Sequence, residues 1–239
     1  MSLVDINMPL PDLLAQPFAH LGAEGSLRVG AVSDPQRSEG WHRARLGKVT
    51  ASRLGDLTAR TKTGWSTSRG AYLNQLLVER LTGQAAQSPV TPAMRWGVEQ
   101  EPLARAAYSF RTDRDALLEG FVEHPHIPMS GASPDGLVGN DGLIEIKCPT
   151  TATHLETLSS SEVPAKHLPQ IYWQMACTGR TWCDFVSFDP RLPEPLRLVI
   201  RRVPRDQAVI NALEAEVTAF LQELEDRMVQ LTTPVRRAA

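Results

Sequence analysis

The sequence predicts one α/β domain in which a central mixed β-sheet is flanked by α-helices. Apolar residues recur at helical spacing over much of residues 39–110 and again over 205–231. Between residues 120 and 201 the apolar runs are short and bounded by turn residues, as in β-strands. The 239 residues can bury a large core, and no repeat or linker divides them. We therefore expect three regions: a loose arm (1–37), a single domain (38–231) and a short tail (232–239).

Six helices are expected in chain order. The first carries Trp41 and Leu54 among its apolar positions. For the second, Ser66 or Ser68 is a suitable N-cap, and Gly83 ends the helix. The last places apolar residues on one continuous stripe. The expected ranges are 39–57, about 66–83, about 94–110, 153–160, 166–178 and about 205–231.

Five strands are expected in the second half of the chain. Turn residues bound each of them, and Pro149 stops the third. In the last strand, apolar Leu198 and Ile200 alternate with Arg197 and Arg201. The expected ranges are 120–124, 136–138, 143–148, 182–188 and about 196–201.

The composition excludes several classes of protein. Hydrophobic residues make up 42% of the chain and charged residues 22%, as in ordinary globular proteins. The apolar stretches are far shorter than the ~20 residues of a membrane span, and the N-terminus lacks the features of a secretory signal. Cys148, Cys177 and Cys183 form no CxxC motif, which argues against a structural zinc or a four-cysteine iron–sulfur cluster. We expect a cytoplasmic protein with no membrane partner.

The charges are unevenly distributed, although the net charge is only −2. The segment from Arg28 to Arg80 holds ten Lys/Arg and four Asp/Glu, which is a local charge of +6. One interpretation is a surface that faces DNA phosphates; the other is a solvated, arginine-rich helical face. Charge alone leaves both open.

The segment from Ser133 to Pro149 carries the most informative polar residues. Side chains alternate along a strand, so Glu145 and Lys147 lie on one face and the flanking isoleucines on the other. A hairpin through residues 139–142 brings Asp135 beside Glu145. Two carboxylates and a lysine suit Mg²⁺ or Mn²⁺ and phosphodiester hydrolysis. The plainer alternatives are a β-turn at Asp135 and a solvated ion pair between Glu145 and Lys147.

Other chemistries find less support. The six histidines show no HExxH spacing, and neither GxSxG nor a glycine-rich phosphate loop is present. His124 and His126 are interpreted as structural or surface residues.

Pro134-Asp135 followed by Glu145-Ile146-Lys147 is similar to the signature of the PD-(D/E)xK, or restriction-endonuclease-like, nucleases. The extended form, SPDGL and then EIKCP, resembles the YqaJ-type viral recombinases, the phage lambda exonuclease family. Other segments agree in the same order over about 39–231: residues 45–52 (RLGKVTAS), Trp96-Gly97 with Glu101, Gln170-Ile171, and Asp189-Pro190-Arg191.

The resemblance implies a restriction-endonuclease-like core and a set of site residues. Asp135 and Glu145 are then metal ligands, with the Ile146 carbonyl as a third, and Lys147 is the catalytic lysine. Glu101 is a further acid near the metal, unless it only pairs with Arg105 one helical turn away. Gln170 positions the attacking water or the scissile phosphate, unless it is simple helix surface.

The resemblance also implies contacts with DNA. Arg45 and Ser52 contact the nucleic acid, and Ser133 contacts its backbone near the site. If residues 45–52 are helical, Arg45 and Ser52 share one face and can hold a 5′-phosphate together. Two positions depart from the family pattern, because Ser109 and Thr153 stand where the relative has an acid and an arginine.

The function implied is a Mg²⁺-dependent 5′-to-3′ exonuclease of linear double-stranded DNA that prefers 5′-phosphorylated ends and tolerates Mn²⁺. It leaves a 3′ single strand for recombination by annealing. The resemblance further implies a homotrimeric ring, a single-strand-annealing recombinase as partner, and a phage or prophage origin in a bacterial cell. The alternatives are an endonuclease of the same fold and a non-catalytic DNA-binding module.

Overall fold

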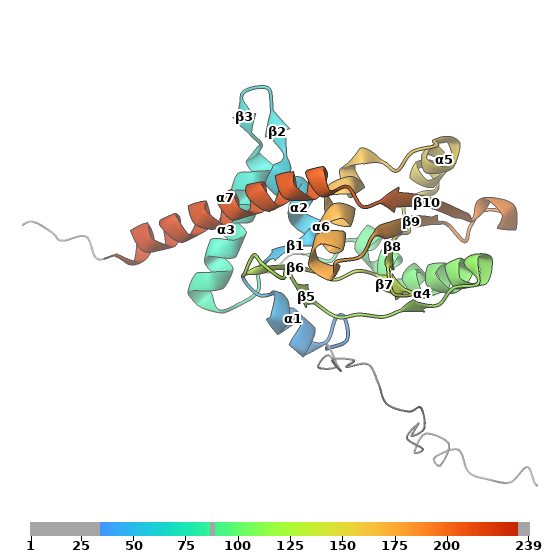
Figure 1. Cartoon of the computed structure of the whole chain (residues 1–239), viewed down its shortest axis with the longest axis horizontal. Coiled ribbons are helices and arrows are strands. Elements are labelled where there is room, and N and C mark those ends of the chain that lie inside the picture. Colours follow the sequence, from blue (N-terminus) through green and yellow to red (C-terminus); the bar gives the residue numbers. More distant parts are fainter. Residues whose placement is uncertain (1–33, 87–88, 234–239) are drawn as a thin grey trace, which may run out of the picture. The chain divides into compact units, whose positions relative to one another are not determined.

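The computed structural model describes residues 34–86 and 89–233 (Figure 1). Its centre is a five-stranded sheet in the order β10-β9-β8-β7-β4. Strands β8 and β9 are parallel and the other neighbours antiparallel, so the sheet is mixed, as expected. The strands are β4 (Ala116–Leu117), β7 (Gly136–Val138), β8 (Gly142–Lys147), β9 (Trp182–Phe188) and β10 (Leu198–Pro204).

Helices cover both faces of this sheet. One apolar cluster joins α3, α6 and α7 to one face, through residues such as Tyr72, Trp173 and Phe220. The other cluster packs Tyr108 of α4 against the opposite face. The helices are α1 (Glu39–Arg45), α2 (Leu54–Thr58), α3 (Thr67–Thr82), α4 (Pro92–Thr112), α5 (Thr151–Ser159), α6 (Leu168–Thr178) and α7 (Gln207–Thr232). None of those helices is long and apolar enough to cross a membrane.

Shorter elements complete the described part of the chain. A small sheet has the order β1-β6-β5, and β2 and β3 form a hairpin that projects beside α3 (Figure 1). These strands are β1 (Val49–Thr50), β2 (Arg60–Thr61), β3 (Gly64–Trp65), β5 (Val122–Glu123) and β6 (Ser130–Ala132). Single turns of 3-10 helix lie at Ala51–Arg53, Ala165–His167 and Glu194–Leu196.

The continuous helix expected over 39–57 is wrong. Helix α1 ends at Arg45, and Gly47 adopts a left-handed conformation with φ 68°. Its backbone N–H donates to the Glu79 carboxylate of α3 at 3.0 Å. The next residues leave helical geometry because Val49 pairs in parallel with Ser130 of β6. A tertiary contact therefore overrides the helical spacing.

The other expected helices and strands are present with shifted ends. Ser66 caps α3 by accepting from the Arg69 N–H, and Gly83 ends it with φ 67°. The helix expected from 166 opens as a 3-10 turn and becomes α6 at Leu168. The last strand begins later than expected, because a 3-10 turn occupies Glu194–Leu196.

The basic segment is largely neutralised by acids from other parts of the fold. Lys48 pairs with Glu123, and the other three contacts reach α7: Arg60 with Glu216, Arg69 with Glu223, and Arg80 with Glu225. The local charge of +6 therefore does not form a continuous bare surface among the described residues. Arg28, the rest of residues 1–33 and the tail 234–239 lie outside the description, while α7 extends to Thr232.

Candidate active site

The β7–β8 hairpin places Asp135 beside strand β8, as the sequence predicts. Gly136 pairs with Ile144 in the hairpin register. One carboxylate oxygen of Asp135 accepts a hydrogen bond from the Ile146 backbone N–H at 2.7 Å. Arg105 of α4 donates to the Asp135 carbonyl at 2.8 Å, which fixes the backbone before the turn. The aspartate is therefore held on both its main chain and its side chain.

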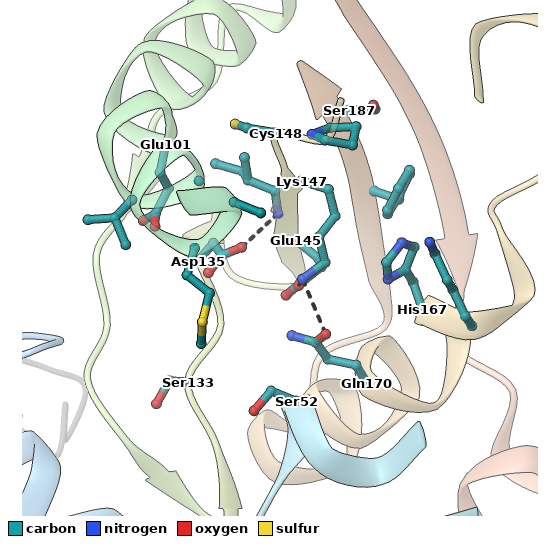
Figure 2. A pocket seen from close by; sticks show the side chains of 18 of the residues that line it. Ser52, Glu101, Ser133, Asp135, Glu145, Lys147, Cys148, His167, Gln170 and Ser187 are labelled. Carbon is teal, nitrogen blue, oxygen red and sulfur yellow. Dashed lines mark hydrogen bonds and ion pairs between the residues drawn. The ribbon is translucent and has the colours of Figure 1, made fainter. Parts of the chain in front are cut away.

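The two faces of β8 differ as expected. Ile144 and Ile146 pack in the apolar cluster under α4, whereas Glu145 and Lys147 face a pocket on the other side (Figure 2). The Glu145 side chain is only 1% exposed, so a solvated ion pair is excluded. Its carboxylate accepts from Gln174 Nε2 at 2.6 Å and from the Lys147 ammonium.

Burial and mutual repulsion dominate the electrostatics of this group. Burial, followed by the charge of Glu145, raises the pKa of Asp135 well above its ordinary value. Burial alone would lower the pKa of Lys147, but the charges of Glu145 and Asp135 outweigh it and raise that pKa. Lys147 therefore stays protonated beside two acids, the buried Glu145 and the half-buried Asp135, whose combined charge it cannot fully neutralise.

These groups fit a hard divalent cation. Carboxylate and carbonyl oxygens are the ligands that Mg²⁺ prefers, and a cation would offset both the burial and the Glu145 charge that raise the pKa of Asp135. Within residues 34–86 and 89–233, no three His, Cys, Asp or Glu side chains converge as a ready-made metal group. A bound ion would therefore need oxygens beyond side chains, such as a backbone carbonyl, water or substrate phosphate.

Glu101 of α4 reaches the same pocket but is already engaged. One of its carboxylate oxygens accepts from Arg105 at 2.6 Å and the other from Arg37 at 2.5 Å. The pairing with Arg105 that the sequence left open is thus present. Glu101 also contributes to the raised pKa of Asp135, after burial and Glu145. A role as a metal ligand requires at least one arginine to release it.

A cavity of about 590 Å³ brings all nine predicted site residues together. Gln170, in the first turn of α6, accepts from the Lys147 ammonium at 3.3 Å (Figure 2). It is therefore not simple helix surface. The nine residues are Arg45, Ser52, Glu101, Ser133, Asp135, Glu145, Ile146, Lys147 and Gln170.

Arg45 and Ser52 meet in the pocket, but not on one helical face. Arg45 ends α1 and stacks over the Trp41 ring, 4.1 Å from its centroid. Its guanidinium and the Trp41 indole N–H both donate to Ser133 Oγ, at 3.3 and 2.9 Å. Ser52 belongs to the 3-10 turn after β1 and lies near Thr50 Oγ1 at 3.5 Å. The expected shared helical face is wrong because the chain turns at Gly47.

Several pocket residues are missed by the sequence reasoning. His167 lines the pocket and stacks on Phe185 with 5.3 Å between ring centroids. Ser187 lines it too, and shares a hydrogen bond of 2.8 Å with the buried His154. A lone histidine and a lone serine carry no motif, so no sequence signal marked them. His124, by contrast, is structural as expected, because it is buried and stacks on Trp173.

The fold and its likeness to known proteins identify a nuclease with a restriction-endonuclease-like core. The model of the YqaJ-like viral recombinase domain matches residues 40–181, so the chain belongs to that family.

Solved structures agree with this family. The crystal structure of an alkaline exonuclease from Laribacter hongkongensis is 47% identical, has a TM-score of 0.76, and covers 81% of this chain and 96% of its own. The same exonuclease in complex with dAMP gives identical values. A phage-related exonuclease from Haemophilus somnus 129PT, 15% identical over 77% of this chain and 96% of its own, shares the fold with a TM-score of 0.61. A comparison with curated protein sequences finds no match.

Proposed function

We propose that this protein is a Mg²⁺-dependent exonuclease that degrades one strand of linear double-stranded DNA from its 5′ end. The observation that supports this most directly is that the half-buried Asp135 and the buried Glu145 lie together beside Lys147, in a chain 47% identical to an alkaline exonuclease. The 3′ single strand left behind would serve recombination by annealing. Membership of the YqaJ-like viral recombinase family supports that last step.

Asp135, Glu145 and the Ile146 carbonyl are the groups that would hold the metal, with Glu101 as a further acid beside them. When bound, Mg²⁺ polarises a phosphoryl oxygen and lowers the pKa of a bound water; Mn²⁺ can replace it because both favour oxygen ligands. The protein contributes the fixed positions of these oxygens. The Ile146 N–H holds the Asp135 carboxylate, and Gln174 holds that of Glu145.

Lys147 and Gln170 act on the reacting phosphate. The Lys147 ammonium is protonated and lies at the pocket surface, where it offsets the negative charge that builds up as water attacks phosphorus. Gln170 accepts from this ammonium and so orients it, leaving its own amide N–H groups for the water or the phosphate. In the net reaction, a water oxygen bonds to phosphorus, the bond from phosphorus to the leaving oxygen breaks, and the proton lost by the water is balanced by the proton that the leaving oxygen takes up from solvent.

The opposite part of the pocket suits the 5′ end of the strand. Arg45 presents a planar guanidinium, held by Trp41, and Ser52 and Ser133 present hydroxyls nearby. An arginine fork with two hydroxyls matches the oxygens of a terminal phosphate. Because such contacts address the backbone, we expect no base specificity.

We further propose the assembly that the family resemblance implies. It consists of a homotrimeric ring that works with a single-strand-annealing recombinase, in a phage or prophage setting. Family membership supports the recombination role, and size-exclusion chromatography with light scattering would measure the number of subunits.

Two substrates test the proposal against its rivals. With Mg²⁺, the enzyme should degrade linear duplex and leave covalently closed circular duplex intact. Cutting of both forms would indicate an endonuclease, and binding without cutting would indicate a DNA-binding module. On linear duplex, label at the 5′ end should be released first, whereas earlier release from the 3′ end would overturn the polarity.

A further inference from the structure

The pocket has two chemically different sides. Glu101 and Asp135 lie on one side, and His167 lies on the other, with Glu145 and Lys147 between them (Figure 2). The second side is built by the 3-10 turn Ala165–His167 and the start of α6. It supplies Lys166, His167 and Gln170 to the lining and no carboxylate. A phosphodiester that reaches a metal on the acidic side would therefore rest its remaining oxygens against this wall.

His167 is held in place by its ring and not by its nitrogens. The imidazole stacks on Phe185 of β9 at an interplanar angle of 25° and is half-buried in the pocket wall. Among the residues that the structure describes, no hydrogen bond is made by either ring nitrogen, although both can donate or accept. The packing thus fixes the ring plane and leaves its polar edge available to a ligand in the pocket.

We propose that His167 binds the scissile phosphodiester by donating an imidazole N–H to a nonbridging phosphate oxygen. This rests on the proposed nuclease function and adds a substrate contact on the wall opposite the carboxylates. Burial, with the charges of Lys147 and Lys166, lowers the pKa of His167 to about 4, so the ring is neutral. A neutral imidazole can donate a hydrogen bond to a phosphate oxygen without adding another cation beside Lys147.

Three substitutions separate hydrogen bonding from packing. His167→Phe keeps the stack on Phe185 but removes both nitrogens, and should lower kcat/KM by about 10- to 100-fold, the usual cost of losing a hydrogen bond to a charged group. His167→Asn and His167→Gln place an amide N–H near the positions of Nδ1 and Nε2, and one of them should recover most of the loss. His126→Phe, at an exposed histidine outside the pocket, is the matched control and should leave kcat/KM unchanged. Thermal unfolding checks that each variant is folded.

Phosphorothioate substrates provide a readout that a merely structural role would not change. Sulfur is a poorer hydrogen-bond acceptor than oxygen, so one diastereomer at the scissile phosphate should cleave more slowly in the wild type. In His167→Phe, the slowing caused by sulfur in that diastereomer should be smaller than in the wild type. The slowing caused by sulfur in the other diastereomer should be unchanged. The proposed contact is overturned if sulfur slows each diastereomer as much in His167→Phe as in the wild type. It is also overturned if this variant matches the wild type on ordinary DNA.

The Glu145→Gln variant separates this inference from the proposed function. If Glu145→Gln is inactive and His167→Phe is fully active, only the His167 contact fails. If Glu145→Gln retains wild-type nuclease activity, the site itself has been misassigned and the nuclease mechanism fails with it.

Discussion

Two sets of carboxylates lie on or next to the central sheet, one at structural positions and one in the pocket. Asp184 of β9 accepts two hydrogen bonds of 2.8 Å from Arg202 and a third from Tyr108. Asp189, just after β9, likewise accepts two hydrogen bonds from one arginine, from Arg191 Nε at 2.7 Å and from Arg191 Nη2 at 2.9 Å. Each of these buried charges thus has an arginine of its own.

The pocket carboxylates are held differently. Asp135 and Glu145 lie together beside one lysine, and burial and the Glu145 charge raise the pKa of Asp135. The hydrogen bonds from Arg191, against the effect of burial, lower the pKa of Asp189 to about 2. The opposite pKa shifts of Asp189 and Asp135 follow from this difference, because Asp189 has an arginine of its own whereas Asp135 shares one lysine with Glu145. A metal ion can supply the positive charge that the pocket carboxylates lack.

Activity should give the largest contrast between the two sets. Glu145→Gln and Asp135→Asn should each lower the nuclease rate by about 1,000-fold, equivalent to roughly 4 kcal/mol, because each removes a charged ligand from the metal site we propose. Asp184→Asn, on the strand beside β8, should remain active at temperatures where it is folded. Initial rates on linear duplex measure this. More than a tenth of wild-type activity in Glu145→Gln would contradict the assignment.

The stability of the protein should depend on the arginine that pairs with a structural carboxylate. Arg202→Ala leaves Asp184 buried without its cation and should lower the free energy of unfolding by about 3 kcal/mol. Arg201→Ala, the neighbouring position, donates only to backbone carbonyls and should cost less, about 1 kcal/mol. Urea unfolding of both variants measures the difference. Equal losses would mean that the Asp184 pair is no more important than a surface contact.

The pH dependence of stability should have opposite signs at the two sites. Asp189, with its pKa lowered to about 2 by Arg191, stabilises the fold above its unfolded pKa of 3.8 by about 2 kcal/mol, and this is lost as the pH falls through 2. Asp189→Asn should therefore destabilise the protein at pH 7. Asp135 has a raised pKa in the folded protein, so its penalty to folding develops as the pH rises above the unfolded pKa of 3.8 and is complete once the pH exceeds the folded-state pKa. Metal-free Asp135→Asn should be more stable than the wild type at pH 7, and the gain should vanish as the pH falls toward 3.8.

Chemical unfolding at several pH values in EDTA tests both signs. Saturating Mg²⁺ should stabilise the wild type and have little effect on Asp135→Asn, because only the wild type keeps the complete ligand set. Destabilisation by Asp135→Asn without metal would show that the pocket acids are structural like Asp189.

The smallest expected effect concerns Arg45, one of the two arginines that line the pocket. Arg45 stacks on Trp41 and donates to Ser133, without a carboxylate partner among the described residues. Arg45→Ala should therefore change stability less than Arg202→Ala, yet remove most of a several-fold preference for 5′-phosphorylated over 5′-hydroxyl duplex. Rates on the two substrates measure this. An equal slowing of both would make Arg45 a general DNA contact.

The β7–β8 hairpin could be predicted from the sequence because its geometry is local. Alternation along β8 separates Glu145 and Lys147 from the two isoleucines, and a short turn returns Asp135 to the strand. The caps of α3 follow from Ser66 and Gly83 for the same reason. Such features depend on residues within about ten positions of one another, so the order of side chains is enough to define them.

Tertiary contacts decided the rest. Pairing of Val49 with β6 broke the expected first helix, and acids of α7 neutralised the basic segment. His167 enters the pocket only because α6 packs against the sheet beside Phe185. These outcomes depend on contacts between residues far apart in the chain. Such contacts override the local helical preference, and they bring acids to a segment that is basic in the sequence. The sequence by itself thus determined the metal-binding hairpin we propose, and only the folded chain determined what surrounds it.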